Sequence, residues 1–555
     1  MSWLLRLRRL GVLAALAMTV TSALIAVPQN AAATSPSDHV LYWNDVLLRT
    51  YRQVGGPPAP LARAGAMMHG AVYDAANSAL CAVGQGTCLG QPYLIKVTPT
   101  AGVIPDLATA IDYAAYNTLK AVYPSLNFDT DLATAQSDIP ASSSRTEGVS
   151  VGTATAQAMI NARSNDGSTN NTPYEFSTAP GFWRPTGSGP AATPNWGLVK
   201  PFAMTSGSQF RPGPPAGYAT MSALLASPEY AAQVNEVKQL GRAANSTRTA
   251  DQTQTAWFWA NDLDGTYKPP GQLFAHTQIV SKLKRLTQAG NARLFGLVAI
   301  AMADAAIVAW DAKYLTNIDL WRPETAIQLA DTDGNPATDP DTAWLPLSAD
   351  RNGVNFSPPF PAYTSGHATF AAAWAGAMRN FFSTDTVTFT ATTDDPHAVG
   401  VTRRFSSFSA AMQEDARSRV YLGVHYQFDA DGGISSGTAL ANYVFANYLR
   451  PVTTYTFNGF YVGGNYVGNY IEVPLPRTVK FEFQLTDASG NVVRDLGAII
   501  GASASSSATV IYEPTFNSTT GRYEISIYTQ KVCPGTFTVQ LRDGTSHSIV
   551  VDCIV

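Results

Sequence analysis

The sequence predicts a mainly α-helical protein that carries a small all-β module near its C-terminal end. Up to about residue 447, Ala and Leu recur at helical spacing, and beyond residue 474 the apolar residues recur with a period of two. Of the 555 residues, 45% are hydrophobic and only 14% are charged, so the chain can bury a sizeable core and intrinsic disorder is excluded. The 40 acidic and 36 basic side chains give a formal net charge of −4, which excludes a polycation built to bind nucleic acid.

The first 33 residues have the composition of a secretory signal peptide. Arg6, Arg8 and Arg9 precede an apolar stretch at 10–27, and small residues follow it at 31–33. We therefore expect cleavage of this segment and a secreted, extracytoplasmic protein, with a retained membrane anchor as the alternative. No later stretch of membrane-spanning length is free of charge, so no stable membrane span is expected after cleavage.

The four cysteines fit an oxidising compartment. Cys81 and Cys88 lie seven residues apart across a glycine-containing loop, and Cys533 and Cys553 both lie among the last predicted strands. Because exported chains meet an oxidant, we expect two short-range disulfides. A zinc site with four thiolates is the alternative, and it would have to gather sulfurs from opposite ends of the chain.

The predicted helices and strands divide the chain after the signal peptide into three parts. Helical periodicity covers residues 62–80, 104–122, 221–240, 294–310 and 367–382, and the segment 294–310 is apolar on nearly all sides, as in a helix buried in a bundle core. Alternating runs at 479–485, 523–527 and 537–541, separated by turn residues, predict a small β-sandwich. The expected parts are a helical domain, a linker rich in Gly, Asn and Tyr, and a β-sandwich domain, at residues 34–450, 451–473 and 474–555.

Three cations stand out in the last third of the helical region, which is otherwise poor in charge. They are Lys313, Arg322 and Arg419. Lys313 closely follows the helix expected in the core, and an unpaired buried charge is costly, so these cations need an anion. A bound oxyanion would meet that need. The alternative is a set of ordinary ion pairs with nearby carboxylates, namely Asp304, Asp311 and Glu324.

A Ser-Gly-His sequence opens the predicted helix that follows a proline-rich loop. Ser365, Gly366 and His367 begin this helix, and such a start directs backbone N–H groups and the positive helix end at an anion. Gly366 also allows close approach of the backbone to a ligand. Farther along, Gly423 is expected to end a helix and to let His425 turn back toward the same pocket.

These clusters carry a family resemblance. Trp-Arg-Pro at 321–323, Pro-Phe-Pro-Ala-Tyr at 359–363 with Ser-Gly-His at 365–367, and Ser-Arg at 418–419 with Gly-Val-His at 423–425 resemble the three-part signature of the vanadium-dependent haloperoxidases and the related acid phosphatases of the PAP2 superfamily. Residues 42–77 also resemble the opening helices of the haloperoxidase branch. The resemblance implies a PAP2/haloperoxidase-like helical bundle and leaves the β module unaccounted for.

The resemblance also implies a cofactor and a role for each matching residue. The cofactor would be vanadate, with phosphate able to occupy the same site, and the catalytic residues would be His367, Lys313 and His425. His425 would bind the vanadium as the axial ligand, and His367 would lie near the opposite apical oxygen. Asp429 would orient the ring of His425, and Asp262 is a candidate partner for Arg419. The equatorial oxygens would be held by Lys313, Arg322, Arg419, Ser365 and the N–H group of Gly366.

One feature departs from the family pattern. The family usually places its lysine seven residues before the arginine, whereas Lys313 and Arg322 are nine apart. Either the helix ends soon after Lys313 and residues 316–319 bulge outward, or Lys313 is displaced from the site. Trp310 stands where some relatives have a tryptophan of the halide pocket, and Phe360 would complete an apolar wall there.

The implied reaction is the oxidation of a halide, chloride or bromide, by hydrogen peroxide to hypohalous acid, which then halogenates a small organic acceptor. The main alternative is an acid phosphatase of the PAP2 type, in which His425 forms a phosphohistidine intermediate and His367 protonates the leaving group. A third reading makes the protein a cell-surface binding protein whose β module is the active part. Partners expected for the first reading are hydrogen peroxide, a halide and an organic acceptor, with no nucleic acid.

Overall fold

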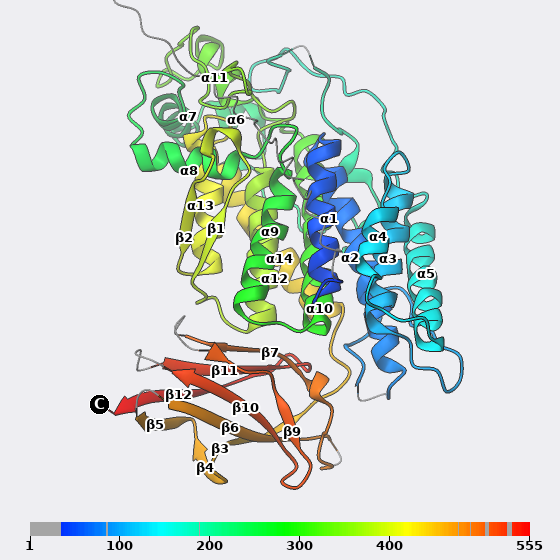
Figure 1. Ribbon diagram of the computed structural model, residues 1–555. Coiled ribbons are helices and arrows are strands. Elements are labelled where there is room, and N and C mark those ends of the chain that lie inside the picture. The colour runs from blue at the N-terminus through cyan, green and yellow to red at the C-terminus, as the bar shows by residue number, and fades with distance from the viewer. Residues whose placement is uncertain are drawn as a thin grey trace, which may run out of the picture.

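The protein consists of a helical body and a strand module (Figure 1), so the predicted mainly α fold class with a C-terminal β part is confirmed. The computed structural model describes residues 35–84, 87–187, 189–474, 477–488, 490–505, 510–529 and 535–554. The predicted signal peptide and Cys533 lie outside the described residues, so the expected pairing of Cys533 with Cys553 stays a prediction. Cys81 and Cys88 are joined by a disulfide, which confirms the first expected pair and leaves neither sulfur for a zinc site.

The helical body is built from elements that together account for most of the described chain up to residue 447. Its helices are α1 (His39–Val54), α2 (Pro58–Cys81), α3 (Leu107–Val122), α4 (Asp129–Ala135), α5 (Ser143–Arg163), α6 (Met221–Leu225), α7 (Pro228–Leu240), α8 (Ala250–Ala260), α9 (Lys268–Leu283), α10 (Gln288–Tyr314), α11 (Pro323–Gln328), α12 (Gly366–Phe382), α13 (Phe408–Tyr421) and α14 (Gln427–Asn447). A two-stranded antiparallel hairpin, β1 (Phe389–Thr392) and β2 (Thr402–Phe405), lies against this body.

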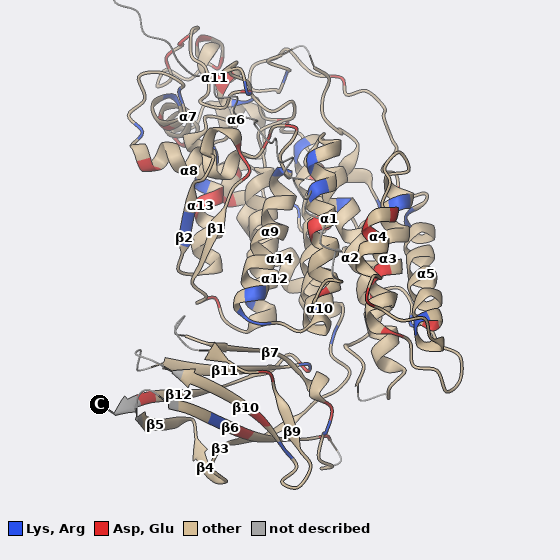
Figure 2. Cartoon of the chain, in the orientation of Figure 1, with Lys and Arg blue, Asp and Glu red and all other residues tan. Residues whose placement is uncertain are grey.

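Helix α10 is the centre of the core. All but the first of its 27 residues are buried, and it packs against α2, α12 and α14. Among the described residues it is the helix long and apolar enough to cross a membrane by length and composition, yet its apolar window is entirely buried inside the protein. Figure 2 shows few charged residues along the central helices, in agreement with a helix surrounded by apolar neighbours.

Helices α12 and α14 pack unusually closely, and this contact positions the start of α12. A Cβ atom at Gly437 would lie 2.4 Å from the backbone oxygen of Thr369, so only glycine permits this approach. The N–H group of Ser365, which caps α12, donates to the backbone oxygen of Asp429 in the first turn of α14 (3.0 Å). The N-terminal ends of the two helices are therefore held side by side.

One predicted helix is divided in the structure. The sequence predicts a single helix at 221–240, but the chain forms α6 and α7 with a break between them. Ser227 caps α7 through its side chain, and Pro228 occupies the first position of that helix. Proline disfavours helical geometry in the residue before it, so a continuous helix is not possible here.

The strand module contains two sheets around one shared apolar core. One sheet has the strand order β4-β3-β6-β10-β8, with β9 paired to β10, and the other has the order β5-β12-β11-β7, in which β5 and β12 run parallel. The strands are β3 (Thr456–Val462), β4 (Asn465–Gly468), β5 (Tyr470–Pro474), β6 (Arg477–Thr486), β7 (Ile499–Ala504), β8 (Val510–Ile511), β9 (Thr515–Asn517), β10 (Arg522–Thr529), β11 (Gly535–Leu541) and β12 (Ser546–Ile554).

The predicted linker at 451–473 is wrong. This segment contains β3 and β4 and most of β5, which join both sheets. These strands have seven, four and five residues, and the glycine turns between them hide the short runs of alternation.

The strand module covers the end of the helical body at which α10 begins. The N–H group of Thr287 donates to the backbone oxygen of Ile500 in β7 (2.9 Å), and Gln540 in β11 donates to the backbone oxygen of Phe381 (2.8 Å). Gly290 of α10 packs directly on Ile500. Lys313 lies 23 residues farther along the same helix, which corresponds to about 35 Å at 1.5 Å per residue. The module therefore borders the end of α10 opposite to Lys313.

Candidate active site

The residues singled out in the sequence come together from four helices at the end of the body remote from the strand module, near α11 in Figure 1. Lys313 lies in the last turn of α10, and Arg322 precedes α11 as its N-cap. Ser365 is the N-cap of α12, and Arg419 lies in the last turn of α13. His425 occupies the short turn between α13 and α14.

Lys313 is fully buried and points at the loop that precedes α12. Its Nζ donates to the backbone oxygens of Pro361 (2.7 Å) and Ala362 (3.2 Å) and lies 4.9 Å from the ring centre of Phe360. Burial is the main reason that the pKa of Lys313 falls well below its ordinary value, and the nearby Arg322 lowers it further. Helix α10 ends at Tyr314, so the longer spacing to Arg322 is taken up by the loop that follows.

Arg322 is also fully buried and is held mainly by backbone oxygens. Its Nε donates to the oxygen of Phe360 (2.7 Å), and its Nη1 donates to the oxygen of Val424 (2.7 Å). The same Nη1 lies 3.0 Å from Nε2 of His425. Burial lowers the pKa of Arg322 to about 9, so the site holds a guanidinium that an anion would stabilise.

The tautomer of His425 follows from its two contacts. Arg322 is a donor only, so Nε2 of His425 must accept, and Nδ1 must then carry the proton that is donated to Oδ2 of Asp429 (2.8 Å). Burial and the neighbouring cations lower the pKa of His425 well below its ordinary value, which keeps the ring neutral. The ring therefore presents an unprotonated nitrogen to the cationic site, which is the form that a metal ligand requires. Gly423, with a φ of 82°, makes the turn that returns His425 to this position, as the sequence predicted.

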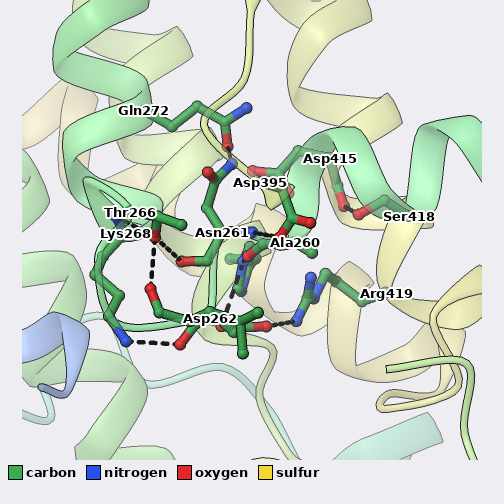
Figure 3. A network of polar contacts seen from close by, with 12 residues as sticks. Ala260, Asn261, Asp262, Thr266, Lys268, Gln272, Asp395, Asp415, Ser418 and Arg419 are labelled. Carbon is green, nitrogen blue, oxygen red and sulfur yellow. Dashed lines mark hydrogen bonds and ion pairs between the residues drawn. The ribbon is translucent and has the colours of Figure 1, made fainter. Parts of the chain in front are cut away.

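Arg419 and His367 meet the same carboxylate, as Figure 3 shows for Arg419. Nη2 of Arg419 donates to Oδ2 of Asp262 (2.6 Å), and Nε2 of His367 lies 3.9 Å from Oδ1 of Asp262 while donating to the backbone oxygen of Ala260 (3.1 Å). Burial raises the pKa of Asp262, but Arg419 and then His367 outweigh it, so the carboxyl stays ionised. Asn261, the left-handed C-cap of α8, sets the turn between Ala260 and Asp262.

The N-terminus of α12 forms another side of the site. The Ser365 hydroxyl accepts from the N–H of Ala368 (3.3 Å), which leaves its own proton free to donate elsewhere. The first N–H groups of a helix have no partner within the helix. A Cβ at Gly366 would lie 3.4 Å from the ring of Trp310, so this N-terminus lies against the tryptophan.

The sequence left open that the three cations form ordinary ion pairs with Asp304, Asp311 and Glu324. This alternative is wrong, because each of these carboxylates has other partners. Asp304 accepts three backbone N–H groups instead, Asp311 pairs with Arg211, and Glu324 accepts from the hydroxyl of Ser357.

Within the described residues, several guanidinium N–H groups at the site are buried without a hydrogen-bond partner. They are Nη2 of Arg322 and both Nε and Nη1 of Arg419. Buried N–H groups are normally satisfied, so these donors indicate a binding place for an oxyanion.

Comparisons with known proteins agree with this geometry. Residues 293–454 match the family model described as the VCPO second helical-bundle domain. The vanadium chloroperoxidase of Curvularia inaequalis is 30% identical over 239 residues, which cover 34% of this chain and 38% of that protein.

The solved structures that match are of similar proteins. The structure of a bacterial vanadium-dependent iodoperoxidase superposes with a TM-score of 0.60 and 23% sequence identity, covering 73% of this chain and 95% of that protein. The structure of a holo-type bacterial vanadium-dependent chloroperoxidase superposes with a TM-score of 0.56 and 17% identity, covering 75% of this chain and 98% of that protein. The chain shares its fold with these enzymes over 73% to 75% of its length, and its sequence resembles the family model over residues 293–454. It nevertheless spans only 38% of the length of the curated fungal relative.

A tetrahedral oxyanion such as vanadate or phosphate fits the chemistry of the residues at this site. Arg322 and Arg419 have unpartnered donors for oxyanion oxygens, and Ser365 retains a hydroxyl proton. His425 offers a neutral nitrogen on the same side. Arg419 is paired with Asp262, whereas burial raises the pKa of Asp429 to about 7 and so weakens it as a counter-charge for Arg322. A bound anion would supply that counter-charge and would favour the charged form of Lys313 as well.

Trp310 and Phe360 form an aromatic wall beside the cations. Their ring centres are 5.0 Å apart, and Lys313 and Arg322 lie 4.9 Å and 4.7 Å from the Phe360 ring centre. Nε1 of Trp310 donates to the backbone oxygen of Ala192 (3.1 Å), which fixes the tilt of the indole.

Two features of the site were missed by the sequence reasoning. Asp415 lies one turn before Arg419 on α13, is buried, and has its pKa raised well above the ordinary value by burial. The four-residue spacing of these two side chains was the available signal. The backbone oxygens of Phe360, Pro361 and Val424, which hold Lys313 and Arg322, carry no sequence signal because every residue has such an oxygen.

Proposed function

We propose that this protein is a vanadate-dependent haloperoxidase that oxidises halide with hydrogen peroxide to hypohalous acid, which a small organic molecule then accepts. The observation that carries the proposal is the set of buried, unpartnered guanidinium donors beside a histidine held in its neutral form. The aromatic wall beside these groups supports halide oxidation, because apolar faces lower the cost of removing water from a halide ion.

The residues of the chain would divide the work among them. Arg322, Arg419, Lys313, Ser365 and the N–H of Gly366 would hold the oxygens of vanadate, and Nε2 of His425 would bind its vanadium. When bound, vanadate supplies Lewis-acid activation of hydrogen peroxide toward attack by a halide. Asp429 keeps the proton of His425 on Nδ1, so the ligating nitrogen stays unprotonated.

His367 is placed to move protons during peroxide binding and product release. Its Nε2 proton is engaged by the backbone oxygen of Ala260, so a further proton would be taken up at Nδ1. Burial and then Arg419 lower the pKa of His367 to about 3. A bound anion would raise that pKa and make the ring a usable proton carrier.

Chloride and bromide are the proposed halides. The neighbouring relatives are named for chloride and for iodide, so these names leave the choice of halide to experiment. We also propose export of the protein. The basic and apolar leader sequence supports it, as does the disulfide between Cys81 and Cys88.

The test uses the purified protein with and without orthovanadate. Bromination and chlorination of a phenol are followed in the presence of hydrogen peroxide, beside hydrolysis of 4-nitrophenyl phosphate. Halogenation that requires vanadate and is lost in Arg322→Ala supports the proposal. Hydrolysis without halogenation would overturn it in favour of the phosphatase, since phosphate suits the same donors.

A further inference from the structure

A second concave region lies in the long coil between α5 and α6, which is drawn in teal in Figure 1. It encloses a cavity of about 870 Å³, a size usual for small-molecule sites. Most of its lining side chains are aromatic or apolar, and the ones used below are Tyr174, Phe176, Trp183, Arg184, Thr193 and Trp196. None of these residues belongs to the cationic site described above.

One wall of this cavity is shared with the halide wall. Ala191 and Thr193 line the cavity, and Ala192 between them accepts from Nε1 of Trp310 (3.1 Å) and donates through its N–H to the oxygen of Pro359 (2.8 Å). The segment 191–193 therefore lines the cavity and is also hydrogen-bonded to Trp310 and to Pro359, which precedes Phe360.

Two aromatic side chains that line the cavity also contact helix α10 close to Lys313. The rings of Tyr174 and Trp183 lie 4.9 Å and 6.3 Å from the ring of Tyr314, the residue that follows Lys313. Side chains of the cavity therefore contact the last turn of α10, the same turn that carries Lys313.

Arg184 gives the cavity a guanidinium group whose hydrogen bonds within the described residues go to backbone oxygens. Its Nη2 donates to the backbone oxygens of Thr178 (2.8 Å) and Ala179 (3.0 Å), and its Nε is buried with no hydrogen-bond partner. The carboxylate at this cavity, Asp319, accepts from the hydroxyl of Tyr174 instead, and burial raises the pKa of Asp319 to about 6. The hydroxyl of Thr193 is likewise buried without a partner. Aromatic walls with one free cation and one free hydroxyl suit a flat ring that carries an acidic group.

We propose that this cavity binds the organic acceptor of the reaction, and that the acceptor class is the phenolic carboxylic acids. The ring would lie among Tyr174, Trp183 and Trp196, with the carboxylate on Arg184 and the phenol hydroxyl on Thr193. This proposal rests on the proposed haloperoxidase function. Hypohalous acid formed beside Trp310 would arise next to the segment 191–193, which borders this cavity.

The transfer step is an electrophilic aromatic substitution. A ring carbon forms a bond to the halogen, the oxygen–halogen bond of the hypohalous acid breaks, and the ring proton leaves with the hydroxide as water. The sum is aryl-H plus HOX giving aryl-X plus water, with the halogen reduced and the ring oxidised. No further oxidant is needed.

The test measures binding with the full-length protein free of vanadate, peroxide and halide, so a failure of halogenation does not affect it. Calorimetric titration uses two probes, 4-hydroxybenzoate and phenol. The variants are Arg184→Gln and Arg184→Lys, and the matched control is Arg404→Gln, an exposed arginine of β2. Arg184→Gln should weaken 4-hydroxybenzoate binding about tenfold or more and leave phenol binding unchanged, because a charged hydrogen bond is lost. Arg184→Lys should retain most of the affinity, and Arg404→Gln all of it.

Two results would overturn the proposal. One is the absence of saturable 4-hydroxybenzoate binding to the unmodified protein, and the other is equal affinity in Arg184→Gln and the unmodified protein. In the active enzyme, Arg184→Gln should raise KM for 4-hydroxybenzoate and leave KM for hydrogen peroxide unchanged. Vanadate-dependent halogenation of phenol without any binding of 4-hydroxybenzoate would retain the proposed function and refute the acceptor site alone.

Discussion

Replacing Asp429 by Asn tests how the site keeps His425 ready to bind vanadium. Oδ2 of Asp429 accepts from Nδ1 of His425 (2.8 Å) and from the N–H of Tyr426 (3.0 Å), and the carboxyl is fully buried. An asparagine amide nitrogen facing the ring would force the histidine proton onto the other nitrogen. That proton would then face Nη1 of Arg322, which is itself a donor at 3.0 Å.

The size of the effect follows from the role of groups that orient a metal ligand. Loss of such a partner costs 10- to 100-fold in affinity or activity, or about 1.4 to 2.7 kcal/mol. We expect Asp429→Asn to weaken orthovanadate binding by this factor in a calorimetric titration. Asp431→Asn is the matched control, because Asp431 is exposed on the same helix and its side chain accepts a hydrogen bond from Gln427. An affinity within twofold of the unmodified protein for Asp429→Asn would refute the account of the tautomer.

Further predictions concern stability and the separate roles of the two parts of the protein. Orthovanadate at 100 times its Kd should stabilise the protein by about 2.7 kcal/mol in thermal unfolding, and Arg322→Ala should abolish this shift, because the anion binds the folded state through that guanidinium. Burial raises the pKa of Asp304 to about 6, so protonation of its carboxyl stabilises the folded protein below about pH 4, and this stability is lost as the pH rises through 6. The contribution to the free energy of unfolding is about 3 kcal/mol, and Asp304→Asn should flatten the pH dependence of unfolding across that range. Ile500→Ala should lower stability by about 2 to 4 kcal/mol, because Ile500 is buried against α10, and should leave the Kd for vanadate unchanged; a large change in that Kd would show that the strand module acts on the site.

Much of the site was accessible from the sequence because its chemistry needs particular residue types. The three cations, the Ser-Gly-His helix start and the turn glycine before His425 are specific requirements, and the structure brings them together. The pairing of Asp262 with Arg419 was also expected and is observed at 2.6 Å. The nine-residue spacing between Lys313 and Arg322 left open whether Lys313 lies in the site. The structure answers this because α10 ends at Tyr314, and that end depends on tertiary packing rather than on a sequence signal.

Two features could not be predicted from the sequence: the backbone oxygens that hold the buried cations, and the short strands at residues 451–473. The oxygens that hold Lys313 and Arg322 belong to a loop whose path is fixed only by tertiary contacts. The strands within the expected linker are too short to show alternation, and they form because neighbouring strands of both sheets pair with them. The break between α6 and α7 has its sequence signal in Ser227-Pro228, but the apolar pattern continues across it and by itself predicts one helix.

A crystal structure of the protein soaked with orthovanadate would test the central claim most directly. We expect vanadium bonded to Nε2 of His425, with its oxygens within hydrogen-bond distance of Arg322 and Arg419. Vanadate bound elsewhere, or an empty site with both guanidinium groups turned toward other protein groups, would contradict it.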